Sequence, residues 1–206
     1  MESPRRTLLA ATLLGSVFAV LLAGELRRPL RGSSGAAAAS PPRPATPRAV
    51  DHEGGLEMRG RLGTRRLSMP ILGLQPTALK DMFDETHFGH RHEALDILAP
   101  RGTPVLAVDD GVVVKLFVSV PGGITVYQFD PTSTWCYYYA HLDRWAEGLH
   151  EGQTLARGDL IGYVGTTGNA PKNTPHLHLA ISRLGSDKRW WQGTPINPYP
   201  ILSATS

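Results

Sequence analysis

From Leu67 to Ser182 the chain alternates short apolar runs with turn-forming residues. The runs hold five to eight residues each, and Gly, Pro and Asp stand between them, as in Asp109-Asp110-Gly111. Runs of this length bounded by turn residues are typical of β-strands. The pattern predicts strands at 95–99, 104–108, 111–118, 123–129, 135–141, 160–164 and 176–182, with brief helical segments only at 77–82 and 143–148. Closely spaced strands predict an all-β fold, an antiparallel β-sandwich or barrel-like single domain.

The first 66 residues follow a different pattern. Arg5 and Arg6 precede an uncharged, Leu- and Ala-rich stretch from Thr7 to Gly24. Its length is at the short end of what spans a bilayer, and Leu21-Leu22-Ala23 is a poor cleavage site for a signal peptidase. We expect residues 1–25 to be a signal anchor, with a cleaved signal peptide as the alternative. Residues 26–66 are rich in Pro, Ala and Arg and predict an extended linker, which leaves 67–206 as the folded domain.

Charge is distributed unevenly along the chain. Residues 1–66 hold 11 Lys/Arg and 5 Asp/Glu, whereas residues 67–206 hold 10 and 13, so the net charges are +6 and −3. A mildly acidic domain argues against nucleic-acid binding, which needs clustered Lys and Arg. Cys136 is the only cysteine, and an intrachain disulfide is therefore excluded.

Histidine and aspartate side chains recur at spacings that suit a metal site. His92 and Asp96 are four residues apart, and His176 and His178 are two apart. On a strand, residues at even spacing share a face, so each pair can point toward one ion. Imidazole and carboxylate are the ligands that zinc prefers in open sites. Together with His141, these residues supply three ligands and two further imidazoles.

The joint pattern of these groups resembles the lysostaphin/LytM-type zinc endopeptidases. The resemblance covers about Leu67 to Ser182 and follows, in family order, Arg91-His92-Glu93-Ala94-Leu95-Asp96-Ile97, Ala99-Pro100-Arg101-Gly102-Thr103-Pro104-Val105, Tyr139-Ala140-His141-Leu142, Gly158-Asp159-Leu160-Ile161-Gly162-Tyr163-Val164-Gly165-Thr166-Thr167-Gly168 and Pro175-His176-Leu177-His178-Leu179. It implies a fold of the duplicated hybrid motif type. It also implies one Zn²⁺ per chain held by His92, Asp96 and His178, with His141 and His176 as the catalytic histidines.

The resemblance further implies a function at the bacterial cell wall. Members of the family hydrolyse peptide cross-links of peptidoglycan, so we expect peptidoglycan as substrate, the membrane as a partner of the N-terminal helix, and a protein activator as a further partner. The expected location is the cell envelope, either anchored to the inner membrane and facing the periplasm or soluble in the periplasm. We expect Asn169 to Thr174 to form one wall of the substrate groove. That the segment around Met69–Phe88 covers the cleft in a latent form is a hypothesis from its position just ahead of His92.

Other functions are alternatives to this one. His92-Glu93-Ala94-Leu95 begins like a helical H-E-x-x-H motif, but Asp96 stands where the second histidine is needed. Cys136 lies in an apolar run, which favours buried packing over a thiol nucleophile. A non-catalytic cell-wall-binding module or an activator of wall amidases, built on the same fold, is the alternative from another functional class. A related enzyme acting on a protein outside the wall is a third.

Overall fold

A computed structural model of the protein describes residue 62, residues 65–87 and residues 89–204. The expected signal anchor and nearly all of the expected linker lie outside the described residues. Within the part that is described, no helix is long and apolar enough to cross a membrane.

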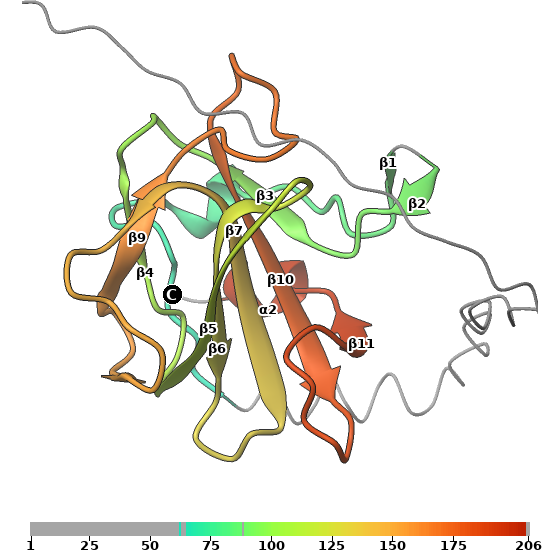
Figure 1. The fold of residues 1–206 in the computed structure, drawn as a ribbon. Helices are drawn as coiled ribbons and strands as arrows, with labels where there is room; N and C mark the ends of the chain where they lie inside the picture. The colour runs from blue at the N-terminus through green and yellow to red at the C-terminus, as the bar shows by residue number, and fades with distance from the viewer. Residues whose placement is uncertain (1–61, 63–64, 88, 205–206) are drawn as a thin grey trace, which may run out of the picture. The chain divides into compact units, whose positions relative to one another are not determined.

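The described chain is built almost entirely of β-strands (Figure 1). They are β1 (Thr86–His87), β2 (His90–Arg91), β3 (Leu95–Leu98), β4 (Pro104–Leu106), β5 (Gly111–Ser119), β6 (Gly123–Phe129), β7 (Trp135–Trp145), β8 (Thr154–Leu155), β9 (Leu160–Val164), β10 (His176–Leu184) and β11 (Gly193–Ile196). All seven strands predicted from the sequence are present, within a few residues of their expected ends. β1, β2, β8 and β11 were not predicted.

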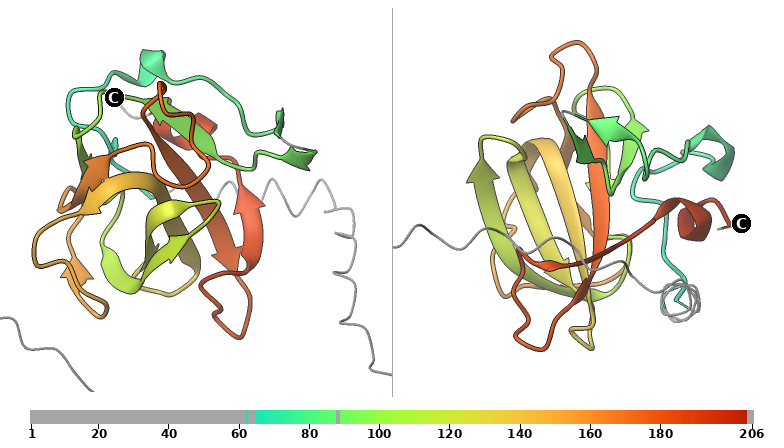
Figure 2. Two further views of the ribbon diagram at one scale, coloured as in Figure 1. Left: turned by 45° about the horizontal axis from the view of Figure 1, so that its top comes forward. Right: turned by 90° about the vertical axis from the view of Figure 1, so that its right-hand side faces the viewer.

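Nine of these strands, β3 to β11, form one antiparallel sheet. Its main path runs β11-β10-β7-β6-β5-β8, while β3 pairs with β10, and β9 pairs with both β4 and β7. The sheet is strongly curled (Figures 1 and 2). The predicted all-β, antiparallel, barrel-like fold class is therefore confirmed.

The core lies inside the curl and contains fully buried tyrosines on the long strand β7. Tyr137 and Tyr139 are 0% exposed, and a buried hydroxyl needs a hydrogen-bond partner. Tyr137 donates to the Asp109 carboxylate at 2.7 Å, and Tyr139 donates to the side-chain carbonyl of Gln128 at 2.8 Å. These hydrogen bonds satisfy the hydroxyls and fix β7 relative to β5 and β6, since Asp109 precedes β5 and Gln128 lies on β6.

Both predicted helical segments are wrong. Residues 143–145 continue β7, because Arg144 pairs with Tyr163 of β9 and Trp145 pairs with Gly162. At 77–82 there is only the 3-10 helix η1 (Pro76–Ala78), which ends where Leu79 turns to extended backbone. The second short helix, α2 (Tyr199–Leu202), follows the last strand and was not predicted. At 143–145, pairing with β9 outweighs the weak local helix propensity.

Residues before the expected domain boundary at Leu67 also contact the sheet. The Arg65 guanidinium forms ion pairs of 2.8 Å with both Asp109 and Asp130. The Asp130 carboxylate is 0% exposed, whereas the Arg65 side chain is 26% exposed. Arg65 thus connects the chain ahead of the domain to the loops that precede β5 and follow β6.

Candidate metal centre and active site

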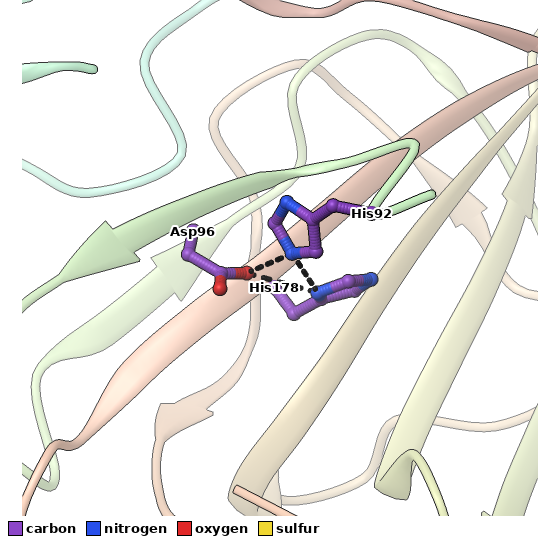
Figure 3. Close-up of side chains that lie close together, drawn as sticks. All are labelled: His92, Asp96 and His178. Atoms are coloured by element: carbon purple, nitrogen blue, oxygen red, sulfur yellow. Dashed lines mark hydrogen bonds and ion pairs between the residues drawn. The ribbon is translucent and has the colours of Figure 1, made fainter. Parts of the chain in front are cut away.

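Asp96 and His178 come from neighbouring strands of the sheet. β3 and β10 pair antiparallel with Asp96 directly opposite His178, so both side chains emerge on the same face. His178 Nδ1 lies 2.9 Å from Asp96 Oδ1, and Figure 3 shows the imidazole and the carboxylate facing each other. His176 lies two residues earlier on β10 and points to this face as well, as the period-2 argument predicts.

His92 reaches the same point from the segment between β2 and β3, and not from a strand. β3 begins at Leu95, as predicted, so the strand-spacing argument does not apply to His92; Glu93, which lies between His92 and β3, has a φ of 53°. That left-handed conformation interrupts an extended backbone and is uncommon for a non-glycine residue. His92 Nε2 nevertheless lies 3.1 Å from Asp96 Oδ1, because the change of chain direction at Glu93 places the imidazole next to the carboxylate.

The second nitrogen of His92 shows how this imidazole is protonated. Its Nδ1 lies 3.2 Å from the carbonyl oxygen of Met82. Since a carbonyl can only accept a hydrogen bond, Nδ1 donates to it, which leaves Nε2 as the nitrogen that a metal could bind. Without a metal, Nε2 lies 3.3 Å from His178 Nδ1 and donates a hydrogen bond to the Asp96 carboxylate. A histidine whose outer nitrogen donates to a backbone carbonyl is the usual arrangement for a metal ligand.

The spacing and chemistry of these three groups fit a zinc ion. Of the residues described, His92, Asp96 and His178 form the group whose ligand atoms all lie close enough to hold one metal. Their three donor atoms are 2.9 to 3.3 Å apart. Donors at ~2.0–2.1 Å from a tetrahedral ion would lie about 3.3 Å from one another. The set therefore needs little rearrangement to accept Zn²⁺.

The electrostatics of the group favour a charged carboxylate. Burial raises the pKa of Asp96, but hydrogen bonds from His178 and His92 outweigh it and hold this pKa well below its ordinary range. The hydrogen bond to Asp96 in turn raises the pKa of His92, against the effect of burial. The carboxylate is thus ionised across the physiological range, as a metal ligand must be.

His141 occupies an irregular position on β7. Its φ is 59°, and the pairing of β6 with β7 shifts register between Ile124 and Val126. The His141 N–H donates to the carbonyl of Gly122 at 2.9 Å. Such bulges bend a strand and redirect a side chain. Here the His141 ring lies beside the rings of His176 and His178, with centroid separations of 4.9 and 5.5 Å.

His141 and His176 are held in the same way by backbone carbonyls. His141 Nδ1 lies 2.9 Å from the carbonyl oxygen of Thr167, and His176 Nδ1 lies 2.8 Å from that of Thr174. Both imidazoles therefore carry a proton on Nδ1, which leaves Nε2 as the nitrogen that can accept or return a proton. Burial, together with the neighbouring His178, lowers the pKa of His141 to about 4. His141 is consequently neutral at pH 7.

All five residues singled out from the sequence line one pocket of about 620 Å³. The pocket has a wall on each side of them. Leu74, Lys80 and Met82 come from the segment that was expected to cover the cleft, and Asn169 and Thr174 come from the loop expected to form a wall. The described structure thus places both segments beside the pocket.

The structure also bears on the other chemistry considered. Asp96 lies on a strand and not on the helix that H-E-x-x-H requires. The Cys136 thiol is buried, and burial raises its pKa to about 12, which removes the thiolate that a nucleophile needs. Sequence reasoning missed the carbonyls of Met82, Thr167 and Thr174 that orient the imidazoles. Backbone groups leave no signal in residue type, so nothing in the sequence could have identified them.

The sequence model described as Peptidase family M23 matches residues 90–198. Among curated proteins, the chain is 35% identical over 128 residues to an L-Ala–D-Glu endopeptidase of Bacillus subtilis, covering 59% of this chain and 38% of that protein. It is 37% identical over 97 residues to the peptidoglycan DD-endopeptidase ShyC of Vibrio cholerae, covering 47% and 21%. The chain therefore spans well under half the length of these relatives.

Solved structures give the same result for the fold. A crystal structure of a putative glycyl-glycine endopeptidase LytM from Ruminococcus gnavus matches with a TM-score of 0.53 and 34% identity. The match covers 61% of this chain and 52% of that chain. The matched family region contains the three candidate metal ligands together with His141 and His176.

Proposed function

Because the chain belongs to peptidase family M23, of the lysostaphin/LytM type, we propose that it is a zinc-dependent endopeptidase that hydrolyses peptide cross-links of bacterial peptidoglycan. The observation that carries this proposal is the arrangement of four histidines near the Asp96 carboxylate, two of them as candidate metal ligands and two beside the metal group. His92 and His178 form a metal-binding group with Asp96, and His141 and His176 lie next to that group with Nε2 available.

The proposed metal site consists of His92 Nε2, one Asp96 oxygen and His178 Nδ1. A zinc ion held there would supply Lewis-acid polarisation of the scissile carbonyl and lower the pKa of a water molecule. Three protein ligands leave a coordination position open, as catalytic zinc sites require. Met82 contributes by holding the His92 imidazole in the tautomer that presents Nε2.

His141 and His176 handle the protons in this mechanism. Each imidazole is fixed by a carbonyl at Nδ1, so proton exchange takes place at Nε2. One Nε2 takes a proton from the attacking water and returns it to the leaving amine. The other, when protonated on both nitrogens, donates a hydrogen bond from Nε2 to the oxygen that becomes negatively charged as the peptide carbonyl is attacked. The pocket around them, about 620 Å³ in volume, has room for a peptide segment.

The substrate class is supported by the relatives and by the pocket. The similar proteins from Bacillus subtilis and Vibrio cholerae are described as an L-Ala–D-Glu endopeptidase and a peptidoglycan DD-endopeptidase. These names differ in the bond that is cut, so the proposal stops at peptide bonds of peptidoglycan. Leu74, Ala78 and Met82 form an apolar part of the pocket wall, and Lys80 in the same segment can pair with a carboxylate of a stem peptide.

The proposed organisation places this domain, residues 67–206 with Arg65 packed against it, in the cell envelope. Residues 1–25 would act as a signal anchor, or as a signal peptide, and residues 26–66 would act as a linker that lets the domain reach the wall. A protein activator would act by binding the segment from Leu74 to Met82, because this segment borders the pocket.

Digestion of purified cross-linked peptidoglycan by the full chain tests the proposal. Soluble products are separated by liquid chromatography and identified by mass spectrometry, with and without a chelator. We expect zinc-dependent loss of cross-linked dimers for the wild type and for His150→Ala, which changes an exposed histidine outside the pocket, but not for His141→Ala. If the wild type binds zinc and peptidoglycan without cutting it, the chain is a wall-binding module or an amidase activator.

A further inference from the structure

A second pocket, of about 270 Å³, lies beside the hairpin that joins β10 to β11. Four aromatic side chains line it: Tyr127, Tyr138, Trp190 and Trp191, here called the aromatic pocket. Trp191 is 61% exposed. Ligand pockets are typically concave and lined by aromatic and apolar side chains with a few polar groups.

The aromatic pocket lies on the same face of the sheet as the candidate metal centre. Along β10, His178 and Ala180 point to one face, and they pair with Ala140 and Tyr138 of β7. Tyr138 in turn pairs with Tyr127 of β6. Because side chains two apart share a face and paired residues project together, His178 and both tyrosines belong to one continuous surface.

Contacts between rings join the two sites without a break. The Tyr138 ring lies 6.1 Å from the His178 ring and 4.6 Å from the Tyr127 ring. Trp190 lies 4.6 Å from Tyr127 and 5.1 Å from Trp191. A molecule that is bound in the pocket at the candidate metal centre and extends along this face would therefore pass over these aromatic rings.

The two pockets differ in the chemistry of their walls. The lining of the pocket at the candidate metal centre includes charged or titratable side chains, namely Lys80, Asp96 and four histidines, among apolar ones. Every side chain that lines the aromatic pocket is uncharged, and its polar groups are the tyrosine hydroxyls, the indole N–H groups, the Cys136 thiol, Ser182 and Gln192. A charged group, the Arg189 guanidinium, lies 5.9 Å from the centroid of the Trp191 ring. Flat aromatic rings with a few hydroxyl and amide groups suit a neutral ligand that has an apolar face and polar edges. A pyranose ring with an acetamido group has this character, whereas a stem peptide with free carboxylates does not.

We infer that the aromatic pocket binds a sugar of the peptidoglycan glycan strand while a peptide attached to that strand occupies the pocket at the candidate metal centre. This inference rests on the proposed function, because a substrate that joins glycan to peptide is what would fill both pockets at once. The pocket adds affinity for saccharide-bearing substrates and places the peptide in a fixed direction along the sheet. Trp191 is the contact to test, because its exposure means that its removal leaves the core intact.

The first test is calorimetric titration of the full chain with a soluble tetramer of β-1,4-linked N-acetylglucosamine. We expect saturable binding to the wild type and at least tenfold weaker binding to Trp191→Ala. Leu72→Ala, which removes another exposed apolar side chain from outside both pockets, should bind like the wild type. Absence of binding by the wild type, or equal binding by Trp191→Ala, would overturn the inference.

The second test compares two substrates that share one cross-linked peptide, with and without its disaccharides. We expect a roughly tenfold higher kcat/KM for the saccharide-bearing substrate, and a ratio near one for Trp191→Ala. If Trp191→Ala lowers both rates and keeps the ratio, the pocket binds peptide and the inference fails. If the wild type cuts neither substrate, the proposed function fails, and the titration alone then decides whether the pocket binds sugar.

Discussion

Asp96 and His178 face each other across the pairing of β3 with β10, with 2.9 Å between Oδ1 and Nδ1. The two ligand atoms are therefore positioned by strand register and not by a flexible loop. A slip of one residue in this pairing would turn one side chain to the opposite face of the sheet. Metal affinity therefore depends on the correct pairing of β3 with β10.

Replacing His178 by alanine should remove zinc from the protein. The change leaves His92 and Asp96 as two ligands, too few for a stable site with an open position. Metal content per chain, measured by mass spectrometry of the purified protein, should fall from one toward zero. The matched variant His150→Ala should keep one zinc per chain. Equal metal content in both variants would remove His178 from the ligand set.

Replacing His141 by alanine should leave zinc bound and slow turnover. The side chain lies beside the metal group without belonging to it, and its Nε2 is placed for proton transfer. We expect zinc content to stay at one per chain while turnover of cross-linked peptidoglycan falls by about 10²- to 10⁴-fold. Loss of the metal from this variant would show that His141 acts as a ligand.

The conformation around His141 depends on close packing at Gly123. This glycine has a φ of 66°, and a Cβ there would overlap Thr167, whose carbonyl holds His141 Nδ1. Gly148 has a similar φ of 76°, but a Cβ there would meet no atom within 4 Å. Backbone strain alone costs about 1 kcal/mol, so Gly148→Ala should lower the free energy of unfolding by that amount.

Gly123→Ala should cost more and should also slow turnover. Relief of the overlap requires a shift of the loop at Thr167, which would displace the hydrogen bond to His141. We expect a loss of more than about 2 kcal/mol in denaturant unfolding, and a lower kcat than for Gly148→Ala. Equal effects of the two substitutions on stability and on kcat would refute the role given to this contact.

Acid should weaken the contribution of Asp130 to stability. Burial raises the pKa of this carboxyl, but hydrogen bonds from Thr132, Trp135 and Thr134 outweigh it, so its pKa in the folded protein is below the ordinary value. A group with a lowered folded pKa stabilises the protein above its unfolded pKa of about 4, and this stabilisation is lost as pH falls through the folded pKa. Arg65 adds an ion pair to the same carboxylate.

Asp130→Asn removes this charge and tests the prediction. At pH 7 we expect the variant to lose about 2 kcal/mol of unfolding free energy, because buried N–H and guanidinium donors lose a charged partner. The difference from wild type should shrink as pH falls below about 4. Asp187→Asn serves as the comparison, since Asp187 pairs with Arg189 on the surface and should cost under about 1 kcal/mol. A difference for Asp130→Asn that does not change with pH would contradict the account.

The strands that could be predicted are those with a long enough pattern. β5, β6, β7 and β10 carry clear apolar runs bounded by turn residues, and the sequence locates all of them. β1, β2 and β8 have two residues each, which is too short for a period to be read. The C-terminal part of β7 was expected to be helical because residues 143–148 carry no strand pattern, and only pairing with β9 makes residues 143–145 extended.

The candidate site could be predicted as a set of residues but not as a geometry. His176 and His178 share a face because of their spacing on β10, as expected. His92 meets Asp96 through a turn at Glu93, and His141 is directed inward by a bulge that depends on β6. These features arise from contacts between segments far apart in the chain, which local pattern does not contain.

Zinc titration of the metal-free chain tests the central claim most directly. The full chain is stripped with a chelator and dialysed, and zinc is added back in steps while bound metal and release of peptidoglycan fragments are measured together. The account predicts that activity is absent at the start and rises in proportion to bound zinc, reaching a plateau at one ion per chain, and that His178→Ala gains neither. Full activity of the metal-free chain, or of His178→Ala, would contradict it.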